Sequence, residues 1–137
     1  MRVLAGVLTL AIAPAMFGAA PPRTATIRVD ARNGSHERGT AILTRRGDEV
    51  TIDVRMTGLM PDSPTQLVHL HSGSCDRLSL RGAIDLEPLA AGRSLTTLRG
   101  RDVKRAFGTA TAYFVSVHEM LANRSQHVAC GGPTPKI

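Results

Sequence analysis

The chain has 137 residues, a formal net charge of +6 at neutral pH and 3% aromatic residues. This length predicts a single domain. The charge alone would suggest a nucleic-acid partner, but fifteen arginines are scattered along the sequence, which has no tryptophan, one tyrosine and three phenylalanines. Because bases would find no stacking platform, we expect no nucleic-acid partner. A positive surface would attract small anions or acidic envelope polymers, or would only keep the protein soluble.

Residues 1–20 have the order of a secretory signal peptide. Met1-Arg2 carries one positive charge, Val3–Ala15 is almost wholly apolar, and small residues follow up to Ala20. The apolar stretch is short for a bilayer span, and no later run is longer. We therefore expect residues 21–137 to form an exported domain, secreted or periplasmic, without a membrane span. The alternative is that the N-terminal segment is retained as an anchor.

The first half of this domain alternates apolar and polar residues with a period of two, which predicts half-buried strands. Three such runs are Thr26–Asp30, Gly39–Thr44 and Val50–Met56. Between the last two, Arg46-Gly47-Asp48 predicts a hairpin turn. The segment Gly58–Pro64 contains two prolines and is predicted to be a loop, because prolines so close together do not fit inside a central strand.

The second half predicts further strands, a short helical turn and a loose tail. The strands are expected at Leu67–His71, Leu78–Leu86, Ser94–Leu98, Thr111–His118 and Gln126–Cys130. Asp102–Phe107 is predicted to form the helical turn, with Asp102 as its N-cap. The Gly131-Gly132-Pro133 tail is expected to be loose. Seven to eight short strands predict an all-β fold, a Greek-key β-sandwich or flattened barrel.

Cys75 and Cys130 are the two cysteines of the chain. Disulfides persist outside the cytosol, so an even count in an exported chain predicts one bridge. Such a bridge would close a loop of about 55 residues and restrict the unfolded chain by roughly 4 kcal/mol. The alternative is a pair of free thiols that serve as metal ligands.

His69 and His71 stand two residues apart on a predicted strand, so their side chains point to the same face while Leu70 points into the core. Two imidazoles placed in this way can reach one metal ion, and His118 can join them from a neighbouring strand. Neutral imidazole suits copper and zinc, whereas the lack of a nearby carboxylate cluster is against calcium and magnesium. An H-x-H pair taken alone is more often two ordinary hydrogen-bonded histidines.

Together these segments resemble the copper–zinc superoxide dismutase fold. Five short motifs keep the order that they have in that family: an alternating strand that runs into Gly-Leu and a Pro/Gly loop, an H-x-H, a cysteine, a V-H-E and an A-C-G. Here they are Val50–Pro61, His69-Leu70-His71, Cys75, Val117-His118-Glu119 and Ala129-Cys130-Gly131. In that family the histidines of these motifs are copper ligands and the cysteines form a disulfide.

The sequence is also similar to small exported bacterial proteins with chordin-like (CHRD) domains, and this likeness is the closer of the two. Those proteins carry an H-I-H-x-G-x-C segment, which corresponds here to residues 69–75, and a similar V-H and A-C-G ending. Proteins of that kind have no settled activity. The likeness therefore implies the fold rather than the function.

Two departures from the dismutases limit what the resemblance implies. No histidine occurs between Cys75 and His118, so the zinc site and its bridging histidine are missing, and zinc is not expected as a cofactor. In the dismutases an arginine three residues before the second cysteine faces the copper, and that position is His127 here. The resemblance thus implies a copper site with His127 as fourth ligand or proton donor. The other three ligands would be His69, His71 and His118.

Three functions follow from these patterns. The first is an exported copper-binding protein with dismutase-like redox chemistry on superoxide. The second is a copper carrier in which Met56, Met60 and Met120 offer soft thioether ligands, although methionine more often fills gaps in a core. The third is a metal-free sandwich module that binds an envelope polymer or another protein.

Overall fold

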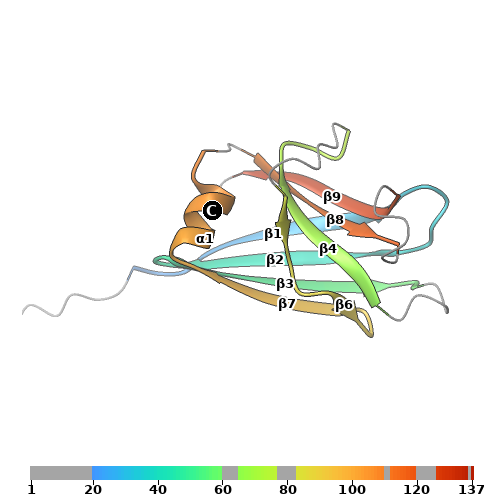
Figure 1. Cartoon of the computed structure of the whole chain (residues 1–137), viewed down its shortest axis with the longest axis horizontal. Coiled ribbons are helices and arrows are strands. Elements are labelled where there is room, and N and C mark those ends of the chain that lie inside the picture. The colour runs from blue at the N-terminus through green and yellow to red at the C-terminus, as the bar shows by residue number, and fades with distance from the viewer. Residues whose placement is uncertain (1–19, 60–64, 77–82, 110–111, 120–125, 136) are drawn as a thin grey trace, which may run out of the picture.

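The structure is a computed structural model that describes residues 20–59, 65–76, 83–109, 112–119, 126–135 and 137 (Figure 1). Apart from Ala20, the expected signal peptide lies outside these residues, so it and the domain boundary that follows it stay predictions. Within the described residues, no helix has the length and apolar character needed to cross a membrane.

The described residues form strands and one short helix. They are β1 (Arg23–Ala31), β2 (Arg38–Arg46), β3 (Glu49–Thr57), β4 (Thr65–Ser72), β5 (Ile84–Asp85), β6 (Leu89–Ala90), β7 (Arg93–Arg99), α1 (Arg101–Phe107), β8 (Ala112–His118) and β9 (His127–Pro135). The expected all-β class is confirmed.

Eight of the strands close into an antiparallel barrel in the order β1-β2-β3-β7-β6-β4-β8-β9, and β9 pairs again with β1. The short strand β5 is additional and pairs with β4. Strands β4, β6 and β7 lie side by side in chain order, while β3, which precedes them, lies beside β7. This is a Greek-key arrangement, and it confirms the predicted flattened barrel. Figure 1 shows α1 at one end of the barrel wall.

The period-two pattern forms the barrel wall because one side of each strand is buried. On β3, Val50, Ile52 and Val54 are completely buried, whereas the residues between them are partly exposed. The turn at Gly47 joins β2 to β3, where Gly47 has a positive φ of 61°. The predicted hairpin is therefore confirmed. Gly39 on β2 lies so close to β3 that an added Cβ would be 1.9 Å from the carbonyl oxygen of Arg55.

The helical turn is confirmed, but its predicted N-cap is wrong. Helix α1 begins at Arg101, its N-cap is Gly100, and no side chain caps it. Asp102 is therefore the second residue of the helix rather than its cap. The reason is that Gly100, with a φ of 51°, turns the chain directly at the end of β7.

The predicted loose tail is also wrong, because β9 continues through Gly131-Gly132-Pro133 to Pro135. Gly131 permits this extension: an added Cβ there would lie 2.2 Å from the carbonyl oxygen of Arg28 on β1. The barrel thus closes through a glycine that lets two backbones approach. The last residue, Ile137, is itself buried.

Two other differences concern the region after β4. Most of the strand expected at 78–86 falls on residues 77–82, outside the described part of the chain, and the described remainder is the two-residue strand β5. Strand β6 was not predicted. It is defined by its pairing with β4, and so short a strand leaves no period-two pattern to detect.

Candidate metal centre

Strands β4 and β8 are antiparallel neighbours, and together they present three histidines on the outer face of the barrel. Leu70 on β4 and Val117 on β8 belong to the core. Because side chains alternate along a strand, His69, His71 and His118 point to the opposite face. This face is nevertheless covered, since His71 is 2% exposed and His118 is fully buried.

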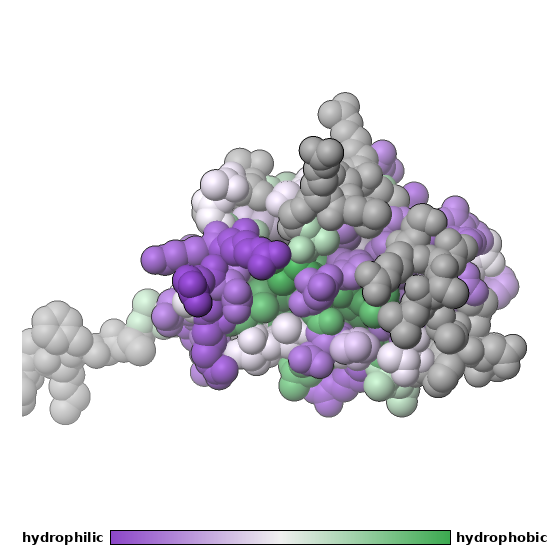
Figure 2. Space-filling view, viewed as in Figure 1, coloured by the Kyte–Doolittle hydropathy of each residue, from purple (hydrophilic) through white to green (hydrophobic). Residues whose placement is uncertain are grey.

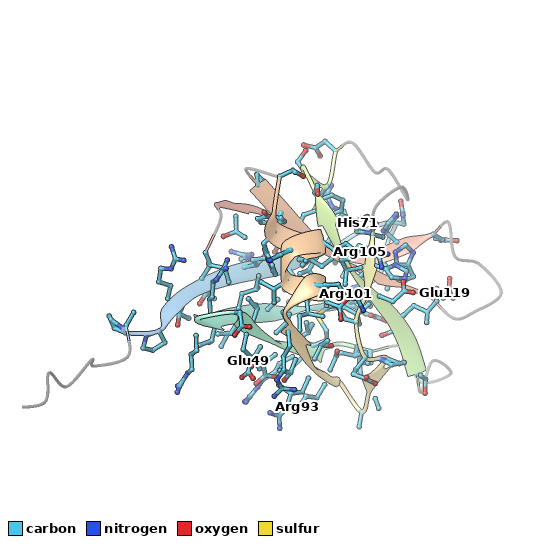
Figure 3. The ribbon with its side chains drawn as sticks, turned by 60° about the vertical axis from the view of Figure 1, so that its left-hand side comes forward. Glu49, His71, Arg93, Arg101, Arg105 and Glu119 are labelled. Carbon is cyan, nitrogen blue, oxygen red and sulfur yellow. A yellow bond between two sulfur atoms is a disulfide. The ribbon has the colours of Figure 1, made fainter. Side chains whose placement is uncertain are left out.

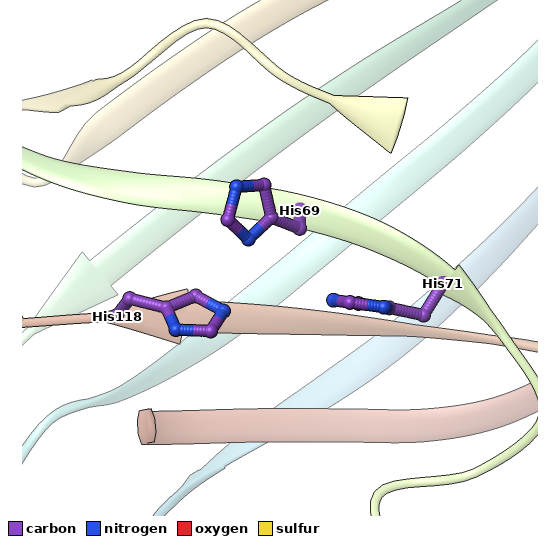
Figure 4. Close-up of side chains that lie close together, drawn as sticks. All are labelled: His69, His71 and His118. Atoms are coloured by element: carbon purple, nitrogen blue, oxygen red, sulfur yellow. The ribbon is translucent and has the colours of Figure 1, made fainter. Parts of the chain in front are cut away.

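The three imidazoles converge on one point. Each offers a ligand atom, and these atoms lie within 4.8 Å of one another. The ring centroids of His69 and His118 are 4.6 Å apart, and those of His69 and His71 are 5.7 Å apart. In Figure 4 a nitrogen of His71 and one of His118 point toward each other, and a nitrogen of His69 points into the same space. The group can hold a metal ion.

Other side chains fix the orientation of the rings. The Nε2 atom of His69 lies 3.2 Å from the Oδ1 atom of Asp85 on β5. The hydroxyl of Ser116 lies 3.0 Å from the Nε2 atoms of both His71 and His118. Histidine ligands commonly bind an outer partner through their second ring nitrogen, so that the first is directed at the metal, and the contact of His69 with Asp85 has this form.

Phe114 is the third neighbour that positions a ring. Its side chain stacks on His71, with ring centroids 4.7 Å apart and an angle of 8° between the ring planes. Phe114 is fully buried but does not belong to the core cluster inside the barrel. It therefore forms an apolar backing for the histidine group on the outer face.

His127 on β9 lies beside the group without belonging to it. Its ring centroid is 4.1 Å from that of His118, but among the described residues the atoms that can share one ion come from the other three histidines. Burial lowers the pKa of His127, and the neighbouring His69 lowers it further. Its Nδ1 atom is buried without a hydrogen-bond partner. The ring is thus neutral near pH 7, and its role as fourth ligand or proton donor stays a prediction.

Cys75 and Cys130 form the predicted disulfide. The alternative, in which they are free thiols that bind metal, is wrong. Cys130 is the Cα partner of Ser116 in the β8–β9 ladder, so the bond lies beside the histidine group. It ties the segment after β4 to β9 at this face.

Of the three methionines in the carrier hypothesis, the described residues include only Met56, and it is not at the site. Met56 is buried in the hydrophobic core, on the inner side of the barrel wall, so it fills core space instead. Met60 and Met120 lie outside the described residues.

Sequence reasoning brought the three histidines together but missed Ser116, Phe114 and Asp85. Ser116 and Phe114 stand two and four residues before His118, so strand alternation places them on its face. That spacing is a usable signal once the strand is known. Asp85 lies within the strand predicted at Leu78–Leu86, but nothing in the sequence indicates that this strand pairs with β4 and brings Asp85 opposite His69.

Basic side chains gather over α1, away from the core. An open hollow there is lined by Arg99, Arg101, Asp102, Lys104 and Arg105. Figure 2 shows hydrophilic side chains concentrated at this end of the molecule, and Figure 3 labels two of them, Arg101 and Arg105. We call these four cations the α1 basic cluster.

The chain was compared with known proteins. No protein-family model and no curated protein matches it.

Proposed function

We propose that this chain is an exported copper-binding protein whose ligands are His69, His71 and His118. The observation that carries the proposal is the convergence of three imidazole nitrogens within 4.8 Å on a covered face. The motif order shared with the copper–zinc superoxide dismutases and the CHRD-like proteins supports it. The Greek-key barrel also agrees with that resemblance.

Copper is preferred because of the donor set. Among the described residues, the group that can share an ion is made of imidazoles alone, and imidazole suits copper, zinc, iron and nickel rather than calcium or magnesium. Copper also binds most tightly in the usual order of divalent ions. The dismutase zinc site depends on histidines that this sequence lacks between Cys75 and His118.

Export is proposed from two observations that agree. Residues 1–20 have the pattern of a secretory signal, and the Cys75–Cys130 disulfide suits an oxidising compartment. In such a compartment, redox chemistry on superoxide is the further activity that the resemblance implies, and the positive net charge would favour the approach of an anion.

The test is a Cu(II) titration of oxidised residues 21–137, followed by calorimetry and by electron paramagnetic resonance. We expect one tight site with nitrogen ligands in the wild type and its loss in the double variant His69→Ala/His71→Ala. His36→Ala is the matched control, because His36 is exposed and lies outside the group. Equal binding by the double variant would contradict the proposal. A superoxide assay on the copper-loaded protein then separates an enzyme from a carrier.

A second candidate function is attachment to an acidic envelope polymer through the α1 basic cluster. The observation that favours it is the open hollow in which four cations surround a single acid, Asp102. Such a surface attracts polyanions, and the attraction weakens as salt screens it. Binding of the copper-free protein to an acidic polysaccharide, lost in Arg101→Ala/Arg105→Ala and at 0.5 M salt, is the expected result. Unchanged binding in that variant would exclude this surface.

A further inference from the structure

The Ser116 hydroxyl lies between two of the proposed metal ligands. Its Oγ atom is 3.0 Å from the Nε2 atom of His71 and 3.0 Å from the Nε2 atom of His118. Ser116 is fully buried, so water does not replace these contacts. The Cα partner of Ser116 across the β4–β8 ladder is His69, which places the hydroxyl in the middle of the histidine group.

The number of protons in this arrangement is limited. A serine hydroxyl donates one hydrogen bond and accepts others, and a neutral imidazole carries one N–H. Ser116 can therefore donate to only one of the two Nε2 atoms. Where Ser116 donates to one of them, the other contact requires the second imidazole to carry its proton on Nε2 and to donate to the serine oxygen. In the metal-free protein, the Nε2 atom of one ring then accepts a hydrogen bond from the hydroxyl. The Nε2 atom of the other ring carries a proton and donates to the serine oxygen.

These two nitrogens are the ones that face the shared space. Figure 4 shows a nitrogen of His71 and a nitrogen of His118 directed at each other across the gap between β4 and β8. His69 differs, because Asp85 occupies its Nε2 atom and the other nitrogen points into the group. Asp85 thus contacts the nitrogen of His69 that faces away from the shared space. Ser116, in contrast, contacts the nitrogens of His71 and His118 that an ion would need.

We propose that Ser116 is a positioning residue that keeps the metal-free centre closed by holding His71 and His118 as opposite tautomers. Ion binding breaks both contacts and moves one proton from Nε2, either to Nδ1 of the same ring or to solvent. The serine therefore lowers the affinity of the site for any ion that needs these two nitrogens. The inference rests on the proposed metal function, but its first test needs no metal.

The first test is nitrogen NMR of the metal-free, histidine-labelled wild-type protein. We expect one of His71 and His118 to carry its proton on Nε2 and the other on Nδ1, and we expect Ser116→Ala to abolish this fixed pairing. Ser116→Thr keeps a hydroxyl and is expected to restore it. Identical tautomers in the wild type, or the same pairing in Ser116→Ala, would overturn the inference.

The second test compares the affinities of the wild type, Ser116→Ala and Ser116→Thr for Cu(II) and for Zn(II). We expect Ser116→Ala to bind about tenfold more tightly, because one hydrogen bond of ordinary net strength no longer competes with the ion. Ser116→Thr should bind like the wild type. Weaker or unchanged binding by Ser116→Ala would each show that the serine does not compete with the ion. If the wild type binds neither ion, the proposed function fails, and the NMR result still decides the role of Ser116.

Discussion

Cys130 on β9 lies directly opposite Ser116 on β8, so the disulfide to Cys75 begins one strand away from the histidine group. The same bond reaches the segment that follows His71 on β4. It therefore connects two of the strands that surround the site, β4 and β9, across the strand between them, β8. A bond in this place stabilises the barrel and also limits how far the histidine-bearing strands can separate.

Removing the disulfide is expected to affect both the stability of the barrel and the binding of metal at the histidine group. In Cys75→Ala/Cys130→Ala, the free energy of unfolding should fall by about 2–5 kcal/mol, since the unfolded chain is no longer restricted. Cu(II) binding should weaken as well, because β4 and β9 are no longer joined beside the site. Urea unfolding and metal titration measure the two effects. Full affinity in a folded, disulfide-free variant would show that the bond serves stability alone.

Asp85 is expected to set the affinity of the site through His69. The Asp85 carboxylate lies 3.2 Å from the Nε2 atom of His69, and loss of such an outer partner commonly costs 10–100-fold in metal affinity. We therefore expect Asp85→Ala to weaken Cu(II) binding by roughly tenfold or more. Asp48→Ala, at an exposed position in the β2–β3 turn, is the control. If both variants bind alike, Asp85 does not orient the ring.

Phe114 should influence the site through its stacking on His71. Phe114→Leu removes an aromatic contact at 4.7 Å, which is worth about 0.5–1.5 kcal/mol beyond buried area. We expect a less stable protein and weaker Cu(II) binding. Phe107→Leu is the matched control, because Phe107 contacts Tyr113 within the core. It should reduce stability to a similar extent and leave the affinity unchanged, and an equal loss of affinity in both variants would contradict a specific role for Phe114.

The barrel could be predicted where the pattern is local. Val50, Ile52 and Val54 alternate with polar residues, and this alternation alone identifies a strand with one buried face. Strand β6 has no such pattern, because two residues become a strand only through pairing with β4 and β7. The extension of β9 was missed for a related reason: Gly131 reads as a turn residue until its backbone contact with β1 is known.

In the site, as in the barrel, the sequence predicts the local features but not those that depend on strand pairing. His69 and His71 share a face because of their spacing, which is a local property. The arrival of His118 depends on β8 pairing with β4; its place on a predicted strand allowed this pairing, and the resemblance in motif order supported it. The spacing of Ser116 from His118 places it on the same face of the predicted strand, but its contacts with both rings depend on the pairing of β8 with β4.

The acid sensitivity of the barrel is expected to depend in part on Asp53. Its carboxylate, on β3, accepts hydrogen bonds from Arg55 and from Arg93 on β7. The bond from Arg55 is the main cause that holds the pKa of Asp53 below its ordinary value of 3.8, while burial opposes it. A carboxylate with a lowered pKa in the folded state stabilises the protein above the pKa of the unfolded chain. That stabilisation is lost as the pH falls through the folded-state pKa.

Asp53→Asn should therefore have a lower Tm than the wild type at pH 7, and the difference should disappear between about pH 4 and pH 2. Arg55→Met should reproduce most of this change, because it removes the principal donor. Thermal unfolding of the three proteins across this pH range checks the prediction, and a difference that persists at pH 2 would show that Asp53 acts by packing rather than by charge.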